Sequence, residues 1–424
     1  MRNILPALIF AASFLNFCAV CHAQAASSDY PENGKVVAAM KNFDKDFEAF
    51  LKKWQIPGAS LCILYKGKAV YQRAFGFADL EKKFPVQNNS LFRIASLSKS
   101  ITAVAIMMLV QKKQLSLDDR AFLILKNLKA CNPNHRIDPR LYDISVKHLL
   151  NCSAGWNHDD LNDPIFGKAL LQAARDCSRS LRPTAKAITR KWMEEHLDYQ
   201  PGTEYSYSNV SYLILGLIIE AVTGQNYNQY IEETLLDPLK LRSVKAGQTL
   251  KSSAGEVHYY SENSGAAILP NIRGSLSEAY GSFFLLEAAP ASIGWIASTY
   301  DLAKFVSCLS GEKPENLASP ISSESLNIML QKPSLDSWRN QSEWFGMGFE
   351  VDADKNNQII SFSRHGSLPG CMSLVEHQKN GISWAAAFNN KPAAYVSSRE
   401  EAKTLIKKAI AKWLPELQAN ETRN

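Results

Sequence analysis

The sequence predicts an α+β fold, an α/β sandwich in which an antiparallel sheet built from both chain ends is flanked by helices and carries an inserted, mainly helical lobe. Both ends alternate apolar and polar residues, whereas the middle follows helical spacing. The 424 residues, 46% of them hydrophobic, exceed the usual size of one compact domain. We expect the sheet lobe over 31–95 and 291–415 and the helical lobe over 96–290, together a single catalytic unit over 26–424.

Two hairpins and a terminal helix mark the ends of this sheet. The stretch "ASLCILYKGKAVYQRAFG" reads as two strands joined at Lys66-Gly67-Lys68, and "CMSLVEHQKNGISWAAAFNN" reads as two strands around Asn380-Gly381. In "SSREEAKTLIKKAIAKWL", Ser398 and Glu401 have capping-box spacing, which predicts that the last helix begins after Ser398.

The first 25 residues have the pattern of a cleaved signal peptide. A short basic start at Arg2 precedes an apolar run and an A-x-A arrangement at Ala23 and Ala25. A membrane anchor is the rival interpretation, but the apolar run is shorter than the roughly 20 residues that a span needs. We therefore expect a periplasmic or secreted protein with no stable membrane insertion after cleavage, although bacterial and eukaryotic export are not distinguished.

Charge and cysteine usage exclude several classes. The formal net charge of +6 falls to +5 when Arg2 leaves with the leader. The sequence has no long basic run, so neither the charge nor its distribution indicates nucleic-acid binding. The remaining cysteines are too sparse for a disulfide scaffold. Cys131 and Cys177 lie in polar, loop-like surroundings and could pair, whereas Cys62 and Cys371 lie in apolar alternating stretches and are expected to be buried thiols.

The first candidate constellation is Ser96 with Lys99, where strand-like "LFRIA" gives way to the helical "SLSKSITAVAIMMLVQKK". On a helix, positions i and i+3 share a face, so the Lys99 ammonium would lie beside the Ser96 hydroxyl. The positive end of the helix dipole would favour an oxyanion there. The alternative is that Ser96 or Ser98 is a helix cap and Lys99 is solvated.

The second constellation is Tyr207-Ser208-Asn209, in a polar turn before an apolar helix that ends at Gly224. Tyr207 could supply a base if a nearby lysine lowered the pKa of its phenol, and Asn209 could hold a substrate amide or the lysine. Alternatively, Asn209 is an ordinary N-cap and Tyr207 is a loop aromatic.

The third constellation is His365-Gly366-Ser367, between two extended runs. Small residues would let a substrate backbone run alongside this strand, and His365 could supply a positive or hydrogen-bonding group. The alternative is a turn with a surface histidine.

In order, spacing and setting, these three groups resemble the serine penicillin-recognising enzymes, in particular the class C β-lactamase-like family. That family has S-x-x-K at a helix start, Y-x-N on a loop of the helical lobe, and K-T-G or H-x-G on a strand edge. The stretches "ISVKHLLNCSAGW", "SIGWIASTYDLAKF" and "WFGMGFEV" are also similar to family text, and the resemblance covers roughly residues 43–413.

The resemblance implies a role for each matched residue. Ser96 would be the acylated nucleophile, Lys99 would assist its deprotonation, and Tyr207 would exchange protons with the serine and the leaving group. Asn209, His365, Gly366 and Ser367 would bind substrate, with Asn209 orienting either substrate or Lys99. The N–H groups of Ser96 and Leu368 would form the oxyanion hole.

Two departures from the family pattern matter for substrate. The triplet reads H-G-S where this branch has H-x-G, so Ser367 adds a side chain where a substrate would approach. "NCSAG" replaces H-T-S-G and places Cys152 near the site but not in it. The segment 156–196 is long and charged, and we interpret it as an insertion that could roof the cleft.

We therefore expect a serine hydrolase, without metal or cofactor, that forms an acyl-enzyme with an ester, amide or D-amino-acid peptide. Its partner would be a small molecule or peptide. The H-G-S triplet, with histidine in place of lysine, resembles the family's peptidases and esterases more than its antibiotic-degrading members, so a β-lactam is the less favoured substrate. The alternative is a catalytically weak or inactive penicillin-binding or scaffold protein of the same fold, which the altered triplet motivates. A metal hydrolase is disfavoured because no H-E-x-x-H occurs, and an α/β-hydrolase because no G-x-S-x-G occurs.

Overall fold

The computed structural model describes residues 30–157, 163–178, 181–269, 271–313 and 317–421. Its main sheet is antiparallel, and within the described residues nine strands belong to it, in the order β1-β3-β2-β14-β13-β12-β11-β10 with β4 paired to β3. These strands are β1 (Glu32–Asn33), β2 (Gly58–Tyr65), β3 (Lys68–Asp79), β4 (Phe84–Pro85), β10 (Glu343–Phe345), β11 (Glu350–Ala353), β12 (Ile359–Leu368), β13 (Cys371–Gln378) and β14 (Ile382–Phe388). The sheet thus comes from both chain ends, as predicted.

The two predicted hairpins are confirmed, and their pairing joins the ends of the chain. β2 and β3 are joined at Lys66-Gly67, and β13 and β14 are joined at Asn380-Gly381. β14 then pairs with β2, Ala385 lying opposite Cys62. Residues more than 300 positions apart therefore form the centre of the sheet.

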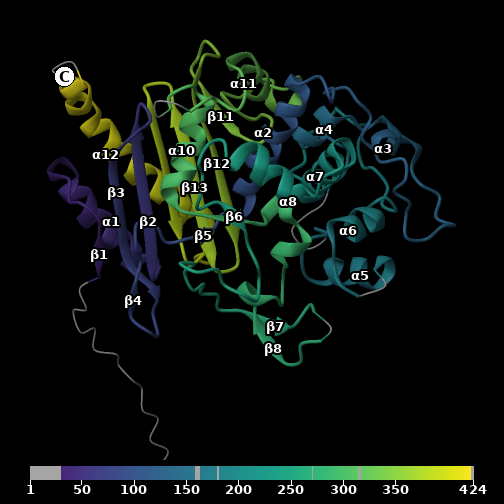
Figure 1. Cartoon of the computed structure of the whole chain (residues 1–424), viewed down its shortest axis with the longest axis horizontal. Helices are drawn as coiled ribbons and strands as arrows, with labels where there is room; N and C mark the ends of the chain where they lie inside the picture. Colours follow the sequence, from purple (N-terminus) through teal and green to yellow (C-terminus); the bar gives the residue numbers. More distant parts are fainter. Residues whose placement is uncertain (1–29, 158–162, 179–180, 270, 314–316, 422–424) are drawn as a thin grey trace, which may run out of the picture.

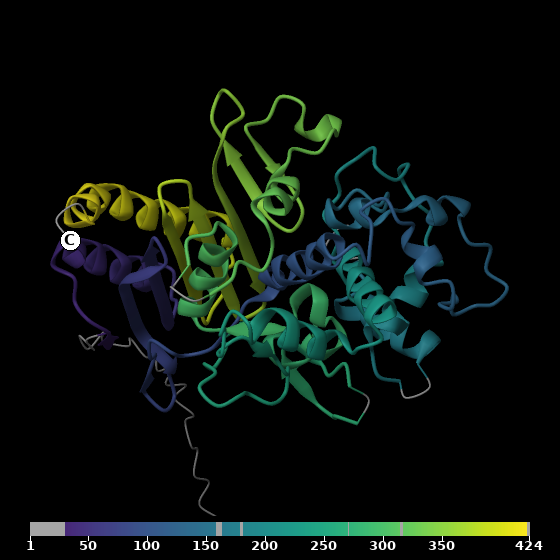
Figure 2. The same cartoon turned by 45° about the horizontal axis from the view of Figure 1, so that its top comes forward.

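Helices cover both faces of the sheet (Figure 1). α1 (Lys41–Lys53) and α12 (Tyr395–Glu421) pack side by side on one face, and Figure 2 shows the same pairing from a second direction. Phe47, Trp384 and Ile406 belong to the buried cluster between this face and its helices. α10 (Thr299–Leu309) packs on the other face, against β2, β13 and β14.

The helical lobe lies at the other end of the molecule from α1 and α12 (Figure 1). Its main helices are α2 (Ser98–Gln111), α3 (Ala121–Ile124), α4 (Val146–Leu150), α5 (Gly167–Cys177), α6 (Ala185–Trp192), α7 (Asn209–Thr223) and α8 (Tyr227–Ile231). The other short elements outside the main sheet are α9 (Pro290–Ile293), α11 (Ser323–Leu330) near the sheet edge, β5 (Phe92–Arg93), β6 (Lys245–Ala246), β7 (Ser264–Ala266), β8 (Ser275–Ser277) and β9 (Trp295–Ala297). The largest buried cluster joins α2 and α7 to the sheet through residues such as Val104, Leu215 and Val375.

Several local predictions can be compared with these elements. Cys131 and Cys177 form a disulfide with a Cα–Cα distance of 5.2 Å, as expected. Cys62 and Cys371 are buried thiols, also as expected. The capping-box prediction is wrong, because α12 already includes Ser398, whose hydroxyl donates a 2.9 Å hydrogen bond to the carbonyl of Tyr395.

The described part of the predicted insertion forms a helical pair. α5 and α6 pack against each other, α6 packs on α7, and the disulfide ties the end of α5 to Cys131. The predicted signal peptide lies outside the described residues. In the part of the chain that the structure covers, every helix is too short or too polar to cross a bilayer.

Candidate active site

Ser96 lies in a short 3-10 turn (Ala95–Leu97) that leads directly into α2. Ala95 has a φ of +48°, a backbone conformation that is uncommon for residues other than glycine. The side chain of Ser98 does not cap the helix; its hydroxyl accepts a 3.2 Å hydrogen bond from the Trp295 N–H. Ser96 does not cap it either, so its hydroxyl remains available for other contacts.

Lys99 and Tyr207 meet at the Ser96 hydroxyl. The Lys99 Nζ lies 3.2 Å from Ser96 Oγ, and the Tyr207 hydroxyl donates to the same Oγ at 2.8 Å. Lys99 is fully buried, whereas Ser96 is partly accessible. The structure therefore brings together the three residues that the first two motifs predicted, although they are up to 111 positions apart.

Asn209 holds Lys99 in place. Ser208 caps α7 through its hydroxyl, so the Asn209 side chain is not the helix cap. Its Oδ1 accepts from Lys99 Nζ at 2.6 Å, and its Nδ2 donates to Asp163 Oδ2 at 2.6 Å. Of the two roles predicted for Asn209, this geometry matches the orientation of Lys99.

Two residues of this contact network, Asp163 and Ser292, were missed by the sequence reasoning. The Ser292 carbonyl accepts from Lys99 Nζ at 3.1 Å, and its hydroxyl donates to Asn209 Oδ1 at 3.0 Å. Ser292 lies in a stretch similar to family text, which was a usable signal. Asp163 lies in the supposed insertion, where no motif marks it.

The pKa directions distinguish the lysine from the tyrosine. Burial, and secondly the Arg364 charge, hold the pKa of Lys99 well below its usual range, which favours a neutral amine that can accept a proton. Burial raises the pKa of Tyr207 to about 12, although Arg364 opposes the rise. The hypothesis that a lysine lowers the phenol pKa is therefore wrong, because desolvation is the larger effect and the adjacent cation is Arg364.

The third motif divides between the two faces of β12. Directly opposite residues on paired strands share a face, and His365 and Ser367 lie opposite Leu374 and Met372. Leu374 and Met372 belong to the buried cluster with α1 and α12. His365 and Ser367 therefore lie on the α12 face, away from Ser96.

Arg364 and Gly366 lie on the face toward Ser96. The Arg364 guanidinium donates to the Tyr207 hydroxyl at 2.7 Å and to the Ser96 carbonyl at 3.4 Å. A Cβ on Gly366 would lie 2.2 Å from the Ile94 carbonyl oxygen and 2.8 Å from the Ser96 nitrogen, so only glycine fits there. The prediction that His365 is the basic residue beside the nucleophile is wrong by one position.

When the triplet is read one residue earlier, the chain no longer departs from the family pattern at this motif. Arg364-His365-Gly366 has a basic residue first and glycine third, as in K-T-G and H-x-G. Ser367 stands after the triplet, and its side chain lies on the α12 face, near Tyr395. Ser367 therefore does not narrow the space beside Ser96.

His365 still contributes to the site, through a carboxylate. Its Nδ1 lies 2.9 Å from a carboxylate oxygen of Glu350, and its Nε2 accepts from Arg399 at 2.9 Å. Glu350 also accepts from Arg364 at 3.0 Å. Although burial raises its pKa, His365, Arg364 and Arg399 together lower the pKa of Glu350 to about 2, so it remains an anion that fixes Arg364.

The strand pairing of β12 favours a different second donor for the predicted oxyanion hole. Leu368 lies opposite Cys371 and closes the turn between β12 and β13, so its N–H faces β13 and is not available to an oxyanion on the other edge of β12. Successive N–H groups of a strand point in opposite directions, so that of Ser367 points to the other edge. β11 pairs with β12 only as far as Ser363, which leaves this edge open beyond it. The Ser96 and Ser367 N–H groups are therefore a better pair of oxyanion donors than those of Ser96 and Leu368.

Cys152 lies beside these groups, as predicted. It is a fully buried free thiol with a φ of +52°, and burial raises its pKa. Its carbonyl accepts a 2.9 Å hydrogen bond from the Ser206 N–H, so Cys152 supports the loop that carries Tyr207. Among the described residues, no group of His, Cys, Asp or Glu side chains has the geometry of a metal site.

The family model described as Beta-lactamase matches residues 43–404. The chain belongs to the Beta-lactamase family. This places it among serine hydrolases of the β-lactamase and penicillin-binding type, in agreement with the site geometry.

This Beta-lactamase-family chain is similar in sequence to part of one relative and similar in fold to two solved structures over most of their lengths. The protein flp of Staphylococcus aureus (strain MW2) is 31% identical over 211 residues, which are 50% of this chain and 39% of that protein. The chain thus matches only about two fifths of that relative's length. EstCE1, described as a hydrolase with promiscuous acyltransferase activity, has a TM-score of 0.66 at 22% identity, with 88% of this chain and 98% of that chain covered. The D-amino acid amidase of Ochrobactrum anthropi SV3 has a TM-score of 0.65 at 20% identity, with 87% of this chain and 99% of that chain covered.

Proposed function

We propose that this protein hydrolyses an ester, an amide or a D-amino-acid peptide through an acyl-enzyme on Ser96. The observation that carries the proposal is the convergence of Lys99 Nζ and the Tyr207 hydroxyl on Ser96 Oγ, at 3.2 and 2.8 Å. A serine is a weak nucleophile near neutral pH, so its proton must leave as it attacks. Both groups are within reach of that proton.

The pKa directions assign the two proton transfers. Lys99, whose pKa is lowered, accepts the Ser96 proton while Oγ forms a bond with the substrate carbonyl carbon. The resulting oxyanion is stabilised by the N–H groups of Ser96 and Ser367. Tyr207, whose pKa is raised, donates its proton to the leaving group as the scissile bond breaks, and the proton on Lys99 then replaces it. Water releases the acyl group by the reverse sequence.

The substrate class rests on the site and on the structural neighbours. The open edge of β12 beyond Ser363 can pair with an extended backbone, which suits a peptide or an amide. Two neighbours are described as a D-amino acid amidase and an acyl-transferring hydrolase, which favours the same chemistry here. A β-lactam, as a strained cyclic amide, belongs to the same reaction class.

We also propose that the protein is exported. The leader pattern in residues 1–25 predicts it, and the Cys131–Cys177 disulfide supports it, because such bonds persist in oxidising compartments. Expression of the full chain followed by mass determination of the processed protein tests this proposal. Loss of residues up to Ala23 or Ala25 is expected, and an uncleaved protein retained in the cytoplasm would contradict it.

A substrate panel tests the catalytic proposal. It contains p-nitrophenyl esters, D-amino-acid anilides, D-Ala-D-Ala peptides and a chromogenic cephalosporin, with Ser96→Ala as the blank. Turnover of at least one class, with a fluorophosphonate adduct on Ser96 by mass spectrometry, is expected. Equal ester turnover by Ser96→Ala would show that Ser96 does not carry the activity, whereas no turnover and no adduct in the wild type would favour the inactive scaffold alternative.

A further inference from the structure

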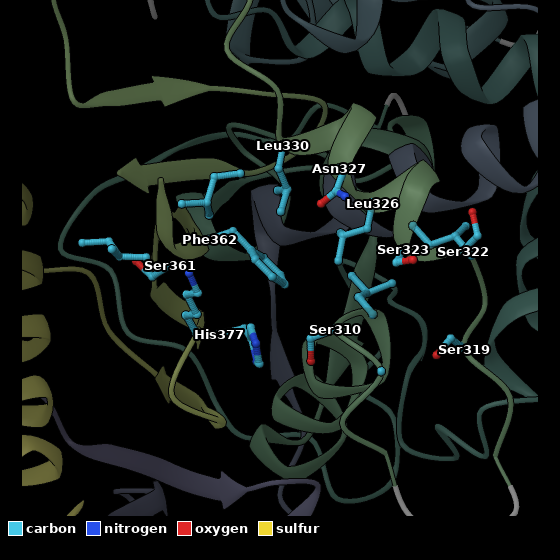
Figure 3. Close-up of a pocket in the computed structure, with 16 residues that line it drawn as sticks. Ser310, Ser319, Ser322, Ser323, Leu326, Asn327, Leu330, Ser361, Phe362 and His377 are labelled. Carbon is cyan, nitrogen blue, oxygen red and sulfur yellow. The ribbon is translucent and has the colours of Figure 1, made fainter. Parts of the chain in front are cut away.

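A cavity whose lining excludes the candidate catalytic residues lies beside α11. Its volume is about 650 Å³, and its walls are α11, the end of α10, and parts of β12 and β13 (Figure 3). Ser96, Lys99, Tyr207 and Arg364 do not line it. Cavities of roughly 300–1,000 Å³ are the usual size of small-molecule sites. The space is therefore large enough for a ligand of its own.

Most of the cavity wall is apolar. Leu326 and Leu330 extend from α11, Phe362 extends from β12, and Figure 3 shows these three around the upper part of the space. Leu309, Ile321, Ile359 and Ile360 complete the apolar lining. A ligand with a hydrocarbon body would bury its surface here, at roughly 25 cal/mol for each Å² removed from water.

Polar side chains occur around the cavity, with Ser323 and Asn327 on the α11 wall, and Lys379 adds a positive charge near His377. His377 and Ser310 lie on the same side in Figure 3. His377 and Lys379 are two positions apart along the chain, and Lys379 is exposed. The His377 Nδ1 bonds with the Ser383 hydroxyl at 2.8 Å, and among the described residues its Nε2 has no hydrogen-bond partner. A ligand headgroup can therefore use His377 and Lys379 together.

The charge of the lining selects the headgroup. Of the described residues that surround the cavity, none is acidic, and Lys379 is the one with a permanent charge. Burial lowers the pKa of His377 to about 4, so its imidazole is neutral and can donate or accept a hydrogen bond. An apolar chain against the leucines and Phe362, with an anionic head beside His377 and Lys379, matches this lining.

We propose that this cavity binds a single-chain carboxylate amphiphile, of the class of a medium-chain fatty acid. The chain lies against Phe362, Leu326 and Leu330, and the carboxylate faces His377 and Lys379. Such a carboxylate would stabilise the protonated imidazole and therefore raise the pKa of His377 on binding. The proposal does not depend on Ser96 chemistry, because the cavity has its own walls.

Calorimetric titration of decanoate and decanol into Ser96→Ala protein tests the proposal without turnover. Decanoate is expected to bind, and Lys379→Glu is expected to weaken it by about fivefold or more while leaving decanol unchanged. Lys412→Glu, on the exposed surface of α12, is the charge-matched control and should change neither. Leu326→Trp fills the apolar part and should abolish binding of both ligands.

NMR titration of the His377 imidazole provides a second readout, with a pKa increase expected only when decanoate is present. The proposal is overturned if decanoate does not bind the Ser96→Ala protein, if adding Leu326→Trp leaves binding intact, or if decanol and decanoate respond equally to Lys379→Glu. The last result would identify a site for neutral apolar molecules.

Discussion

The two faces of β12 carry neighbouring residues with different tasks. On one face, Arg364 contacts Tyr207 and Gly366 lies against the backbone beside Ser96. On the other, His365 and Ser367 contact residues of α12. A shift of one residue along a strand moves a side chain through the full thickness of the sheet. The comparison shows that the role of a motif residue depends on its face as much as on its type.

The largest effect that separates the two faces is expected at Gly366. In Gly366→Ala the new Cβ would press on the Ile94 carbonyl and the Ser96 nitrogen, and so displace an oxyanion donor. Ester kcat/KM should fall by about 10²-fold or more. Ser367→Ala, on the opposite face, is the matched control and should stay close to wild type. An active Gly366→Ala protein with unchanged melting temperature would break the comparison.

A change in pH dependence is the next largest effect expected. The Arg364 charge helps to hold the pKa of Lys99 down, so Arg364→Gln should raise it. Because the neutral amine is the base, activity is lost as pH falls through that pKa, and the acid limb of kcat/KM should move to higher pH. Arg364→Lys keeps the charge and should leave the limb in place. A limb that moves equally in both variants would mean that the charge is not the cause.

The smallest effect is expected at Ser367 itself. Ser367→Gly restores the small residue that the family pattern suggested, but the side chain that it removes points toward Tyr395. Its kcat/KM should therefore remain within about twofold of wild type, as for most surface changes. A large gain in turnover of a bulky cephalosporin would show that the Ser367 side chain does face the substrate.

Much of the fold was predictable because its signals are local. The two hairpins carry turn residues between alternating strands, and the helical pattern of the middle of the chain is plain. The start of α12 was not predictable, because Ser398 and Glu401 have the spacing of a helix cap although the helix begins at Tyr395. Short capping patterns do not exclude a helix that begins earlier.

The candidate site was predictable in part. Ser96, Lys99, Tyr207 and Asn209 each belong to a spaced motif, and the structure brings them together. The register of the third motif was not predictable, because Arg364-His365-Gly366 and His365-Gly366-Ser367 both contain a basic residue and a glycine. The pairing of β12 with β13 decides between them, and that pairing is a property of the folded sheet.

The acylation rate of two variants tests this account most directly. Stopped-flow measurement of the p-nitrophenol burst should show that Arg364→Gln slows acylation of Ser96 by about 10²-fold or more, since it removes the cation that bonds to Tyr207. His365→Gln should slow it by about tenfold at most, since His365 acts only through Glu350. The reverse order, with His365→Gln the slower variant, would contradict the assignment of Arg364 to the nucleophile.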